Sequence, residues 1–286
     1  MLASLLGAAV LALAAYDGVV IGRALYVGGQ LARESSPYSQ QPPNATGALL
    51  VVGDSTGVGT GAEDPADSVA GRLGQALPNT RIDNLAVNGA LTEDVLGQLR
   101  DAPLPRYDAI LVQVGGNDAL RFTPLDRLAA DIAAVLNRAG ERAPYTALMS
   151  TGDLGAAPAL PWPVAPVYSA RSRAVRDRFL AAAREHGADY VDLFTGASDN
   201  GFRQAPDRYY ARDGLHLSGA GYGSWYDRLT AAAAAQGRQS IDLLTADPAT
   251  GRGVELFAAG QAGALRELQG LGRRELLAAL VLAAIL

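Results

Sequence analysis

Cysteine is absent from the 286 residues of the chain, and histidine occurs only twice. The first absence excludes disulfide bonds and metal sites built from thiolates. The second excludes a metal site with three histidine ligands and leaves His186 and His216 as candidates for a general base near neutral pH. His186 stands directly before Gly187 at the end of a predicted helix, where a histidine interacts favourably with the helix dipole. His216 is therefore the candidate base.

Runs of basic residues are also absent. Lysine and arginine together number 24 against 29 acidic residues, which gives a net charge of −5. The chain therefore lacks the basic patch that nucleic-acid binding requires, and we expect no nucleic acid among its partners. Apolar residues make up 49% of the chain, enough for a large core, and the length suits one α/β domain with attached segments.

Long apolar runs are confined to the two ends of the chain. Residues 2–22 are apolar except for Ser4 and Asp17. The uncharged part, residues 2–16, is shorter than the ~20 residues that a spanning helix needs. A span extended to Gly22 would place the Asp17 carboxylate inside the bilayer, which is costly.

Three interpretations of this N-terminal segment remain open. It is a membrane anchor, a signal peptide with residues 12–14 (Ala-Leu-Ala) as the cleavage site, or an ordinary helix packed on the domain. Arg23 and Arg33 follow the apolar run, which by the positive-inside rule would leave the main domain cytoplasmic. We predict an apolar helix over residues 1–33 that anchors or exports the chain, with no assignment of topology.

Two further segments flank the predicted core domain, which covers residues 48–235. Residues 34–47 are polar and rich in proline, as expected of a linker. Residues 236–286 are predicted to form a helical tail, whose last part, residues 276–286, is apolar but too short to span a bilayer. Both apolar ends are candidate membrane contacts.

Strand and helix patterns alternate along the core domain. Short apolar runs predict strands over residues 48–53, 81–86, 108–114, 145–151 and 188–193. Helical patterns are centred on residues 64–77, 91–101, 124–138 and 168–186, and a last helix follows Ser218. This βαβα alternation predicts an α/β fold with a central parallel sheet covered by helices on both sides.

One long connection interrupts the alternation. Residues 153–167 contain four prolines and Trp162 after the fourth predicted strand. Loops of this length at the carboxyl end of a strand are often binding loops, which makes Trp162 a candidate substrate contact. The alternative is a rigid crossing on the surface.

Four short polar motifs carry the candidate chemistry. They are Gly-Asp-Ser (53–55), Asn-Gly (88–89), Gly-Gly-Asn-Asp (115–118) and Asp-Gly-Leu-His (213–216). The first three follow the first three predicted strands directly. Because the carboxyl ends of parallel strands share one edge of the sheet, we expect these motifs to meet above the same crevice.

The four motifs together supply the groups needed for acyl transfer. Ser55 is a candidate nucleophile, His216 can take its proton, and Asp213 can accept the other imidazole N–H. The backbone N–H groups of Ser55 and Gly89 and the side-chain amide of Asn117 can bind the oxyanion that forms during the reaction.

At this point the chain resembles the SGNH (GDSL-type) hydrolases, over about residues 49–226. The family motifs occur in order: Gly-Asp-Ser with Gly59 four residues after the serine, a glycine after the second strand, Gly-x-Asn-Asp, and Asp-x-x-His. The resemblance implies a flavodoxin-like three-layer α/β/α sandwich, esterase or lipase-type activity and no cofactor or metal. One departure is Asn88, which precedes Gly89 where relatives often have serine or a second glycine nearby.

The same resemblance implies the roles argued from the residues. Ser55, Asp213 and His216 would form the catalytic triad, and Ser55, Gly89 and Asn117 would form the oxyanion hole. We therefore predict a serine ester hydrolase of the carboxylesterase, lipase or O-deacetylase type with an acyl-enzyme intermediate. Its substrate would be a small ester or an acylated glycan or lipid.

Two other classes of function remain open. Residues 57–62 fit the glycine pattern of dinucleotide-binding domains, with Asp83 near the end of the second strand as the ribose ligand. However, that pattern starts four residues beyond the predicted strand, and this interpretation leaves the Asp-x-x-His motif unused. A binding protein that keeps the fold without turnover is the other alternative.

Overall fold

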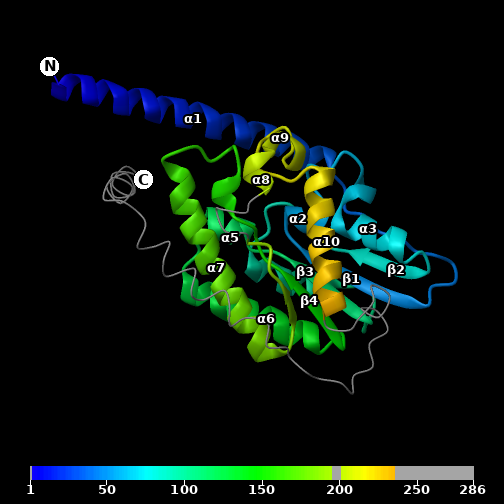
Figure 1. The fold of residues 1–286 in the computed structure, drawn as a ribbon. Coiled ribbons are helices and arrows are strands. Elements are labelled where there is room, and N and C mark those ends of the chain that lie inside the picture. The colour runs from blue at the N-terminus through cyan, green and yellow to red at the C-terminus, as the bar shows by residue number, and fades with distance from the viewer. Residues whose placement is uncertain (1, 195–200, 236–286) are drawn as a thin grey trace.

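The computed structural model describes residues 2–194 and 201–235, so the predicted tail over 236–286 lies outside the described residues. Five parallel strands form one sheet in the order β2-β1-β3-β4-β5 (Figure 1). The strands are β1 (Gly47–Gly53), β2 (Thr80–Asn84), β3 (Ala109–Gln113), β4 (Tyr145–Met149) and β5 (Asp189–Val191). All five predicted strands are present, with ends that differ by up to two residues.

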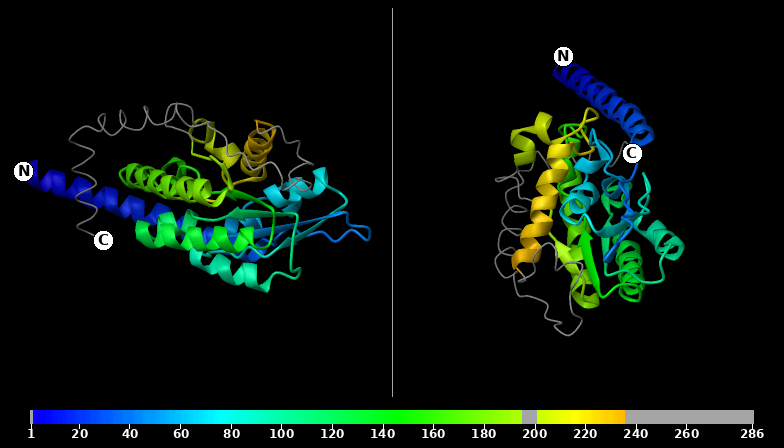
Figure 2. Two further views of the ribbon diagram at one scale, coloured as in Figure 1. Left: turned by 90° about the horizontal axis from the view of Figure 1, so that it is seen from below. Right: turned by 90° about the vertical axis from the view of Figure 1, so that its right-hand side faces the viewer.

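Helices cover both faces of the sheet, as two views of the ribbon show (Figure 2). One layer contains α3 (Val69–Ala76) and α10 (Gly219–Ala235). The opposite layer contains α4 (Val95–Asp101), α6 (Leu125–Gly140) and α7 (Val164–His186). The three-layer α/β/α architecture predicted from the sequence is confirmed.

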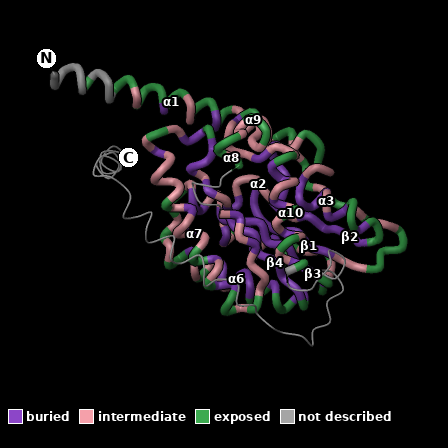
Figure 3. The backbone as a smooth tube through the Cα atoms, viewed as in Figure 1, coloured by how far each residue is buried: buried purple, intermediate pink, exposed green. Residues whose placement is uncertain are grey.

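The apolar run in β1 follows from this double cover. Successive side chains of a strand point to opposite faces, so Leu49 and Val51 pack with α3 and α10, while Leu50 and Val52 pack with α4, α6 and α7. All four side chains are buried, and the strands form the buried centre of the molecule (Figure 3).

The proline-rich connection before α7 is shorter than predicted. Residues 154–156 form a short 3-10 turn, and α7 begins at Val164 rather than at residue 168. Pro166 lies in the first turn of α7. Backbone N–H groups there have no acceptor within the helix, so the N–H that proline lacks costs no hydrogen bond. The prolines therefore mark a helix start as well as a loop.

The N-terminal helix α1 (Leu2–Glu34) lies across the carboxyl edge of the sheet and extends well beyond it (Figure 1). From Asp17 onward it presents a stripe of buried and half-buried residues at helical spacing, of which Asp17, Ala24 and Gly28 are buried. Burial raises the pKa of the Asp17 carboxyl. By length and composition the segment Leu11–Glu34 could cross a membrane, yet its inner stripe faces the domain.

The predicted linker packs against the edge strand of the sheet. Gln40 forms an antiparallel bridge with Ile82 of β2, and its side-chain amide donates hydrogen bonds to the Leu77 and Thr80 carbonyls at 2.9 and 2.7 Å. Tyr38 packs against the core layer that contains α3. Residues 35–46 therefore hold α1 close to the domain.

Candidate active site

Ser55 is the first residue of the short helix α2 (Ser55–Val58), directly after the carboxyl end of β1. The preceding Asp54 caps this helix, because its carboxylate accepts hydrogen bonds from the Thr56 N–H at 2.9 Å and the Thr56 hydroxyl at 2.8 Å. Burial raises the pKa of the Asp54 carboxyl. The strand, the cap and the helix together fix the Ser55 backbone at the rim of the sheet.

Asp213 and His216 are held by a tight turn before α10. The N–H groups of Leu215 and His216 each donate to Asp213 Oδ1 at 3.0 Å. The His216 ring reaches the other oxygen of the same carboxylate, with 2.6 Å between Nδ1 and Oδ2. The turn requires a left-handed residue, and Gly214 supplies it with φ of +70°.

The protonation of this pair follows from the pKa of Asp213. Burial by itself raises that pKa, but the hydrogen bond and charge of His216 and the two backbone donors outweigh it, so the pKa lies below its ordinary value. Asp213 is therefore a carboxylate that can only accept, and His216 Nδ1 must carry a proton. In the neutral imidazole Nε2 is then an acceptor, and the Ser55 hydroxyl, 3.2 Å away, donates to it.

The predicted oxyanion donors follow the next two strands. Gly89 lies in the turn after β2 with φ of +81°, and Asn117 lies in α5 (Gly116–Leu120) after β3. The Asn117 amide donates to the Ala90 carbonyl at 3.1 Å, which places it beside the Gly89 turn. Among the described residues, the N–H groups of Ser55 and Gly89 have no hydrogen-bond acceptor.

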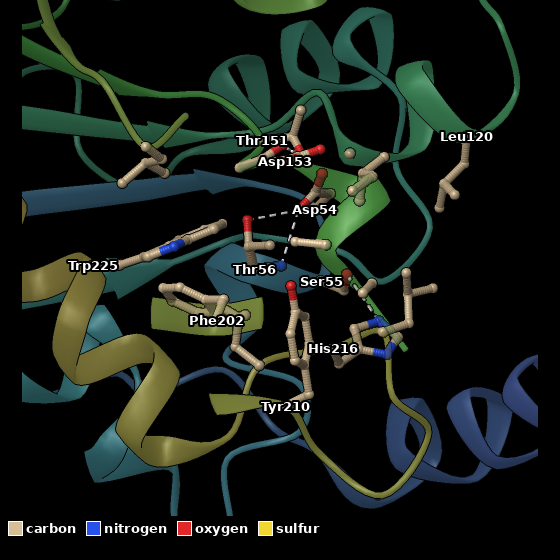
Figure 4. Close-up of a pocket in the computed structure, with 18 of the residues that line it drawn as sticks. Asp54, Ser55, Thr56, Leu120, Thr151, Asp153, Phe202, Tyr210, His216 and Trp225 are labelled. Atoms are coloured by element: carbon tan, nitrogen blue, oxygen red, sulfur yellow. Dashed lines mark hydrogen bonds between the residues drawn. The ribbon is translucent and has the colours of Figure 1, made fainter. Parts of the chain in front are cut away.

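A cavity that is open to solvent adjoins Ser55 and His216. In the view of Figure 4, these two residues lie at one side, and Trp225 lies at the other beyond Phe202 and Thr56. The lining also includes apolar side chains from the loops and from the end of α5: Leu120, Leu154, Leu193, Leu215 and Leu217. Polar groups at the upper wall in this view come from Thr151 and Asp153 after β4.

Two residues singled out from the sequence lie away from this cavity. Trp162 does not line it, and its side chain is 57% exposed. A tryptophan that does line the cavity is Trp225, which lies on α10. His186 is the last residue of α7, and Gly187 ends the helix with φ of +69°.

A hydrogen-bonded group beside the site was not predicted as a unit. Thr60 donates to the Asn88 side-chain oxygen at 2.6 Å, and the buried Tyr222 hydroxyl donates to the Thr60 carbonyl at 2.8 Å. Asn88 departs from the pattern of the family, but nothing in the sequence pairs it with Thr60, 28 residues away. Residues 57–62 begin within the short helix α2 and end before a 3-10 turn that begins at Pro65, so their glycines do not open the long helix that dinucleotide binding uses.

Comparisons with known proteins agree with this geometry. A family model described as GDSL-like lipase/acylhydrolase matches residues 51–223. A curated relative, a GDSL-like esterase of Mycobacterium tuberculosis, is 28% identical over 182 residues, which are 61% of this chain and 57% of the relative. The chain thus spans little more than half the length of that relative.

Solved structures share the fold. LAE5, an α/β hydrolase enzyme from the metagenome of Lake Arreo in Spain, has a TM-score of 0.52 at 17% identity over 66% of this chain and 95% of its own. TesA has a TM-score of 0.51 at 21% identity, covering 65% of this chain and 97% of its own. Since the family model covers more than half of the residues, this chain belongs to the GDSL-like lipase/acylhydrolase family, whose members are hydrolases of ester bonds.

Proposed function

We propose that this protein is a serine ester hydrolase in which Ser55, His216 and Asp213 form the catalytic triad. The observation that carries the proposal is the continuous hydrogen-bonded chain of 3.2 Å from Ser55 Oγ to His216 Nε2 and 2.6 Å from His216 Nδ1 to Asp213 Oδ2. This order of nucleophile, base and orienting carboxylate is the arrangement that activates a serine hydroxyl.

The reaction proceeds in two halves. Ser55 Oγ attacks the ester carbonyl carbon while its proton moves to His216 Nε2, and the tetrahedral intermediate then expels the alcohol, which takes that proton. The resulting acyl-enzyme is hydrolysed by water in the reverse order, with His216 again taking and returning the proton. Asp213 keeps the imidazole in the required tautomer and stabilises the imidazolium.

The oxyanion is bound by the N–H groups of Ser55 and Gly89 and by the amide of Asn117. Their lack of an acceptor within the described residues supports this role for the two backbone groups. The Asn117 nitrogen carries two hydrogens, so its bond to Ala90 leaves a second one for the substrate. Loss of one such donor commonly costs about 10²–10³ in rate.

The cavity favours esters with an acyl chain longer than acetyl. Its space extends from Ser55 toward Trp225 along a largely apolar wall that includes Leu193 and Phe202. Each CH₂ group buried there contributes ~0.8 kcal/mol, or about fourfold in binding.

The test is hydrolysis of p-nitrophenyl esters of graded acyl length by the full chain. We expect kcat/KM to rise about threefold to fourfold per added CH₂ from the acetate until the cavity is filled. A serine-directed fluorophosphonate should abolish this activity, with the adduct mapped to Ser55 by peptide mass spectrometry. A preference for the acetate would point to an O-deacetylase, and neither hydrolysis nor labelling would favour a binding protein.

Contact with a lipid surface is the second part of the proposal. Among the described residues, every large apolar side chain that is exposed lies on α1 or in the loops after β2, β3 and β4. They are Leu11, Tyr16, Val19, Leu25, Tyr26, Val87, Phe122 and Trp162. From Asp17 onward, one stripe of α1 is packed on the domain, so this part of the helix is not free to cross a bilayer. We therefore propose binding at the membrane surface while α1 stays docked.

Vesicle flotation tests this contact. The full chain should float with phospholipid vesicles, and the double variant Leu25→Glu/Tyr26→Glu, which places two charges on the exposed face of α1, should reduce the bound fraction severalfold. The matched control is Ala76→Glu/Asn79→Glu, two exposed positions before β2 at the opposite edge of the sheet. Equal flotation of both variants, or none by the unaltered chain, would overturn the lipid contact.

A further inference from the structure

Helix α1 contacts the Asp213–His216 pair through a glycine. Gly28 is buried, and a Cβ atom placed on it would lie 3.1 Å from Asp213 Oδ2 and 3.6 Å from His216 Cε1. The first of these distances is shorter than nine in ten of the contacts that real Cβ atoms make. The helix backbone therefore packs directly against the carboxylate, at a distance that glycine permits because it has no Cβ atom. Gly28 lies outside the matched family region, residues 51–223.

The same end of α1 is bonded to the Gly89 turn through Asn88. The Asn88 amide donates to the Ala32 carbonyl at 3.1 Å, while its oxygen accepts from Thr60 at 2.6 Å. Ala32 lies in the last turn of α1, whose carbonyls have no partner within the helix. Ser35 completes the group, with 2.9 Å between its hydroxyl and that of Thr60. Asn88, the unusual residue before Gly89, thus joins the end of α1 to the predicted oxyanion loop.

We propose that the last two turns of α1 are a structural part of the active site. In this arrangement Gly28 is a positioning residue for Asp213 and His216, and Asn88 is a positioning residue for the Gly89 turn. The inference rests on the proposed function for its catalytic meaning. Physically, the helix backbone excludes water from the Asp213 carboxylate and limits the positions that it can occupy, so that the imidazole is held ready for Ser55.

Substitution of two adjacent glycines by alanine tests the proposal. Both Gly28→Ala and Gly29→Ala raise the helix propensity of α1, so neither should lower the melting temperature through the helix itself. At Gly29 the new Cβ would meet only Arg33 Nη1, at an ordinary 3.7 Å. We expect Gly28→Ala to lower kcat about tenfold with KM nearly unchanged, Gly28→Val to lower it further, and Gly29→Ala to leave it unchanged.

A spectroscopic readout separates this inference from the proposed function. The proton on His216 Nδ1, in its 2.6 Å bond to Asp213, should give a downfield ¹H resonance that is assigned by its loss in His216→Ala. That resonance should move in Gly28→Ala and stay in place in Gly29→Ala, even if no ester is hydrolysed. An unmoved resonance, or equal kcat in the two alanine variants, would overturn the role of α1. An inactive unaltered chain with a moved resonance would instead overturn the ester hydrolase.

Asn88→Ala provides the second arm of the test. This substitution removes the bonds to Ala32 and Thr60 without touching the triad. We expect kcat to fall about tenfold while fluorophosphonate still modifies Ser55, because the nucleophile and base are unchanged and the oxyanion loop is displaced. Unchanged kcat would remove Asn88 from the proposal.

Discussion

The Ser55→Ala variant should lose at least about 10⁴ in kcat for ester hydrolysis, with an unfolding midpoint close to that of the unaltered chain. The Ser55 hydroxyl is the atom that would form the acyl-enzyme, and within the part of the chain that the structure describes no other side chain is hydrogen-bonded to His216 Nε2. Alanine is compatible with the start of α2, and the cap provided by Asp54 does not use the serine side chain. Steady-state kinetics and thermal denaturation of both proteins measure the two effects.

The two histidines provide the matched control for this prediction. His216→Ala should reduce both turnover and fluorophosphonate labelling of Ser55 by a comparable factor, because the serine loses its base. His186→Ala removes the same side chain from the end of α7 and should leave labelling intact. Near-normal turnover in Ser55→Ala, or equal labelling in the two histidine variants, would contradict the triad.

The Gly53→Ala variant should fail to accumulate as folded protein, or should unfold with a free energy lower by more than about 3 kcal/mol. Gly53 ends β1 with φ of +142°, and a Cβ there would lie 1.8 Å from the Gln113 carbonyl oxygen of β3. The strand cannot move away easily, because Gln98 binds both the N–H and the carbonyl of Gly53 at 2.7 and 2.9 Å. Denaturant unfolding, or the yield of soluble protein, measures the loss.

Gly140→Ala is the control for this second prediction. Gly140 is exposed at the end of α6, and a Cβ there would have no atom within 4 Å. Replacing glycine by alanine in a helix stabilises it by about 0.5–1 kcal/mol. The two glycine substitutions should therefore change the stability in opposite directions, and a Gly53→Ala variant as stable as the unaltered chain would show that the end of β1 tolerates a side chain.

The sequence predicted the sheet and the meeting of the polar motifs for the same reason. Strands buried on both faces are continuous apolar runs, such as residues 49–52, and parallel strands place the residues that follow them at one edge. The sequence alone therefore predicts that Ser55, Gly89 and Asn117 lie at that edge. It does not predict the distance from His216 to Ser55, because that distance depends on how the turn at Gly214 and the start of α10 pack over the sheet.

The position of the N-terminal helix could not be predicted from its sequence pattern. Its apolar residues fit a membrane segment, in which the Asp17 carboxylate would be costly to bury. In the structure, Asp17 lies on the stripe that faces the domain, together with Ala24 and Gly28.

The two tryptophans differ from expectation in a similar way. Trp162 lies in the connection that was predicted to be a binding loop but does not line the cavity, whereas Trp225 lines the cavity from a helix. Helical spacing cannot distinguish a core side chain from one at a cavity wall.

The docking of α1 also changes how freely the enzyme can search for substrate. A flexible linker of about a dozen residues between a membrane-bound segment and a domain would let the domain move over ~20 Å in any direction. Here a single helix of 33 residues, ~50 Å long, runs without a break from the free N-terminal turns to the residue that rests on Asp213. Whatever the first turns of α1 bind is thereby held at a fixed height and tilt relative to Ser55. Under the proposed lipid contact, ester groups at that height would be presented to Ser55 directly, whereas esters in bulk solution would have to diffuse to it.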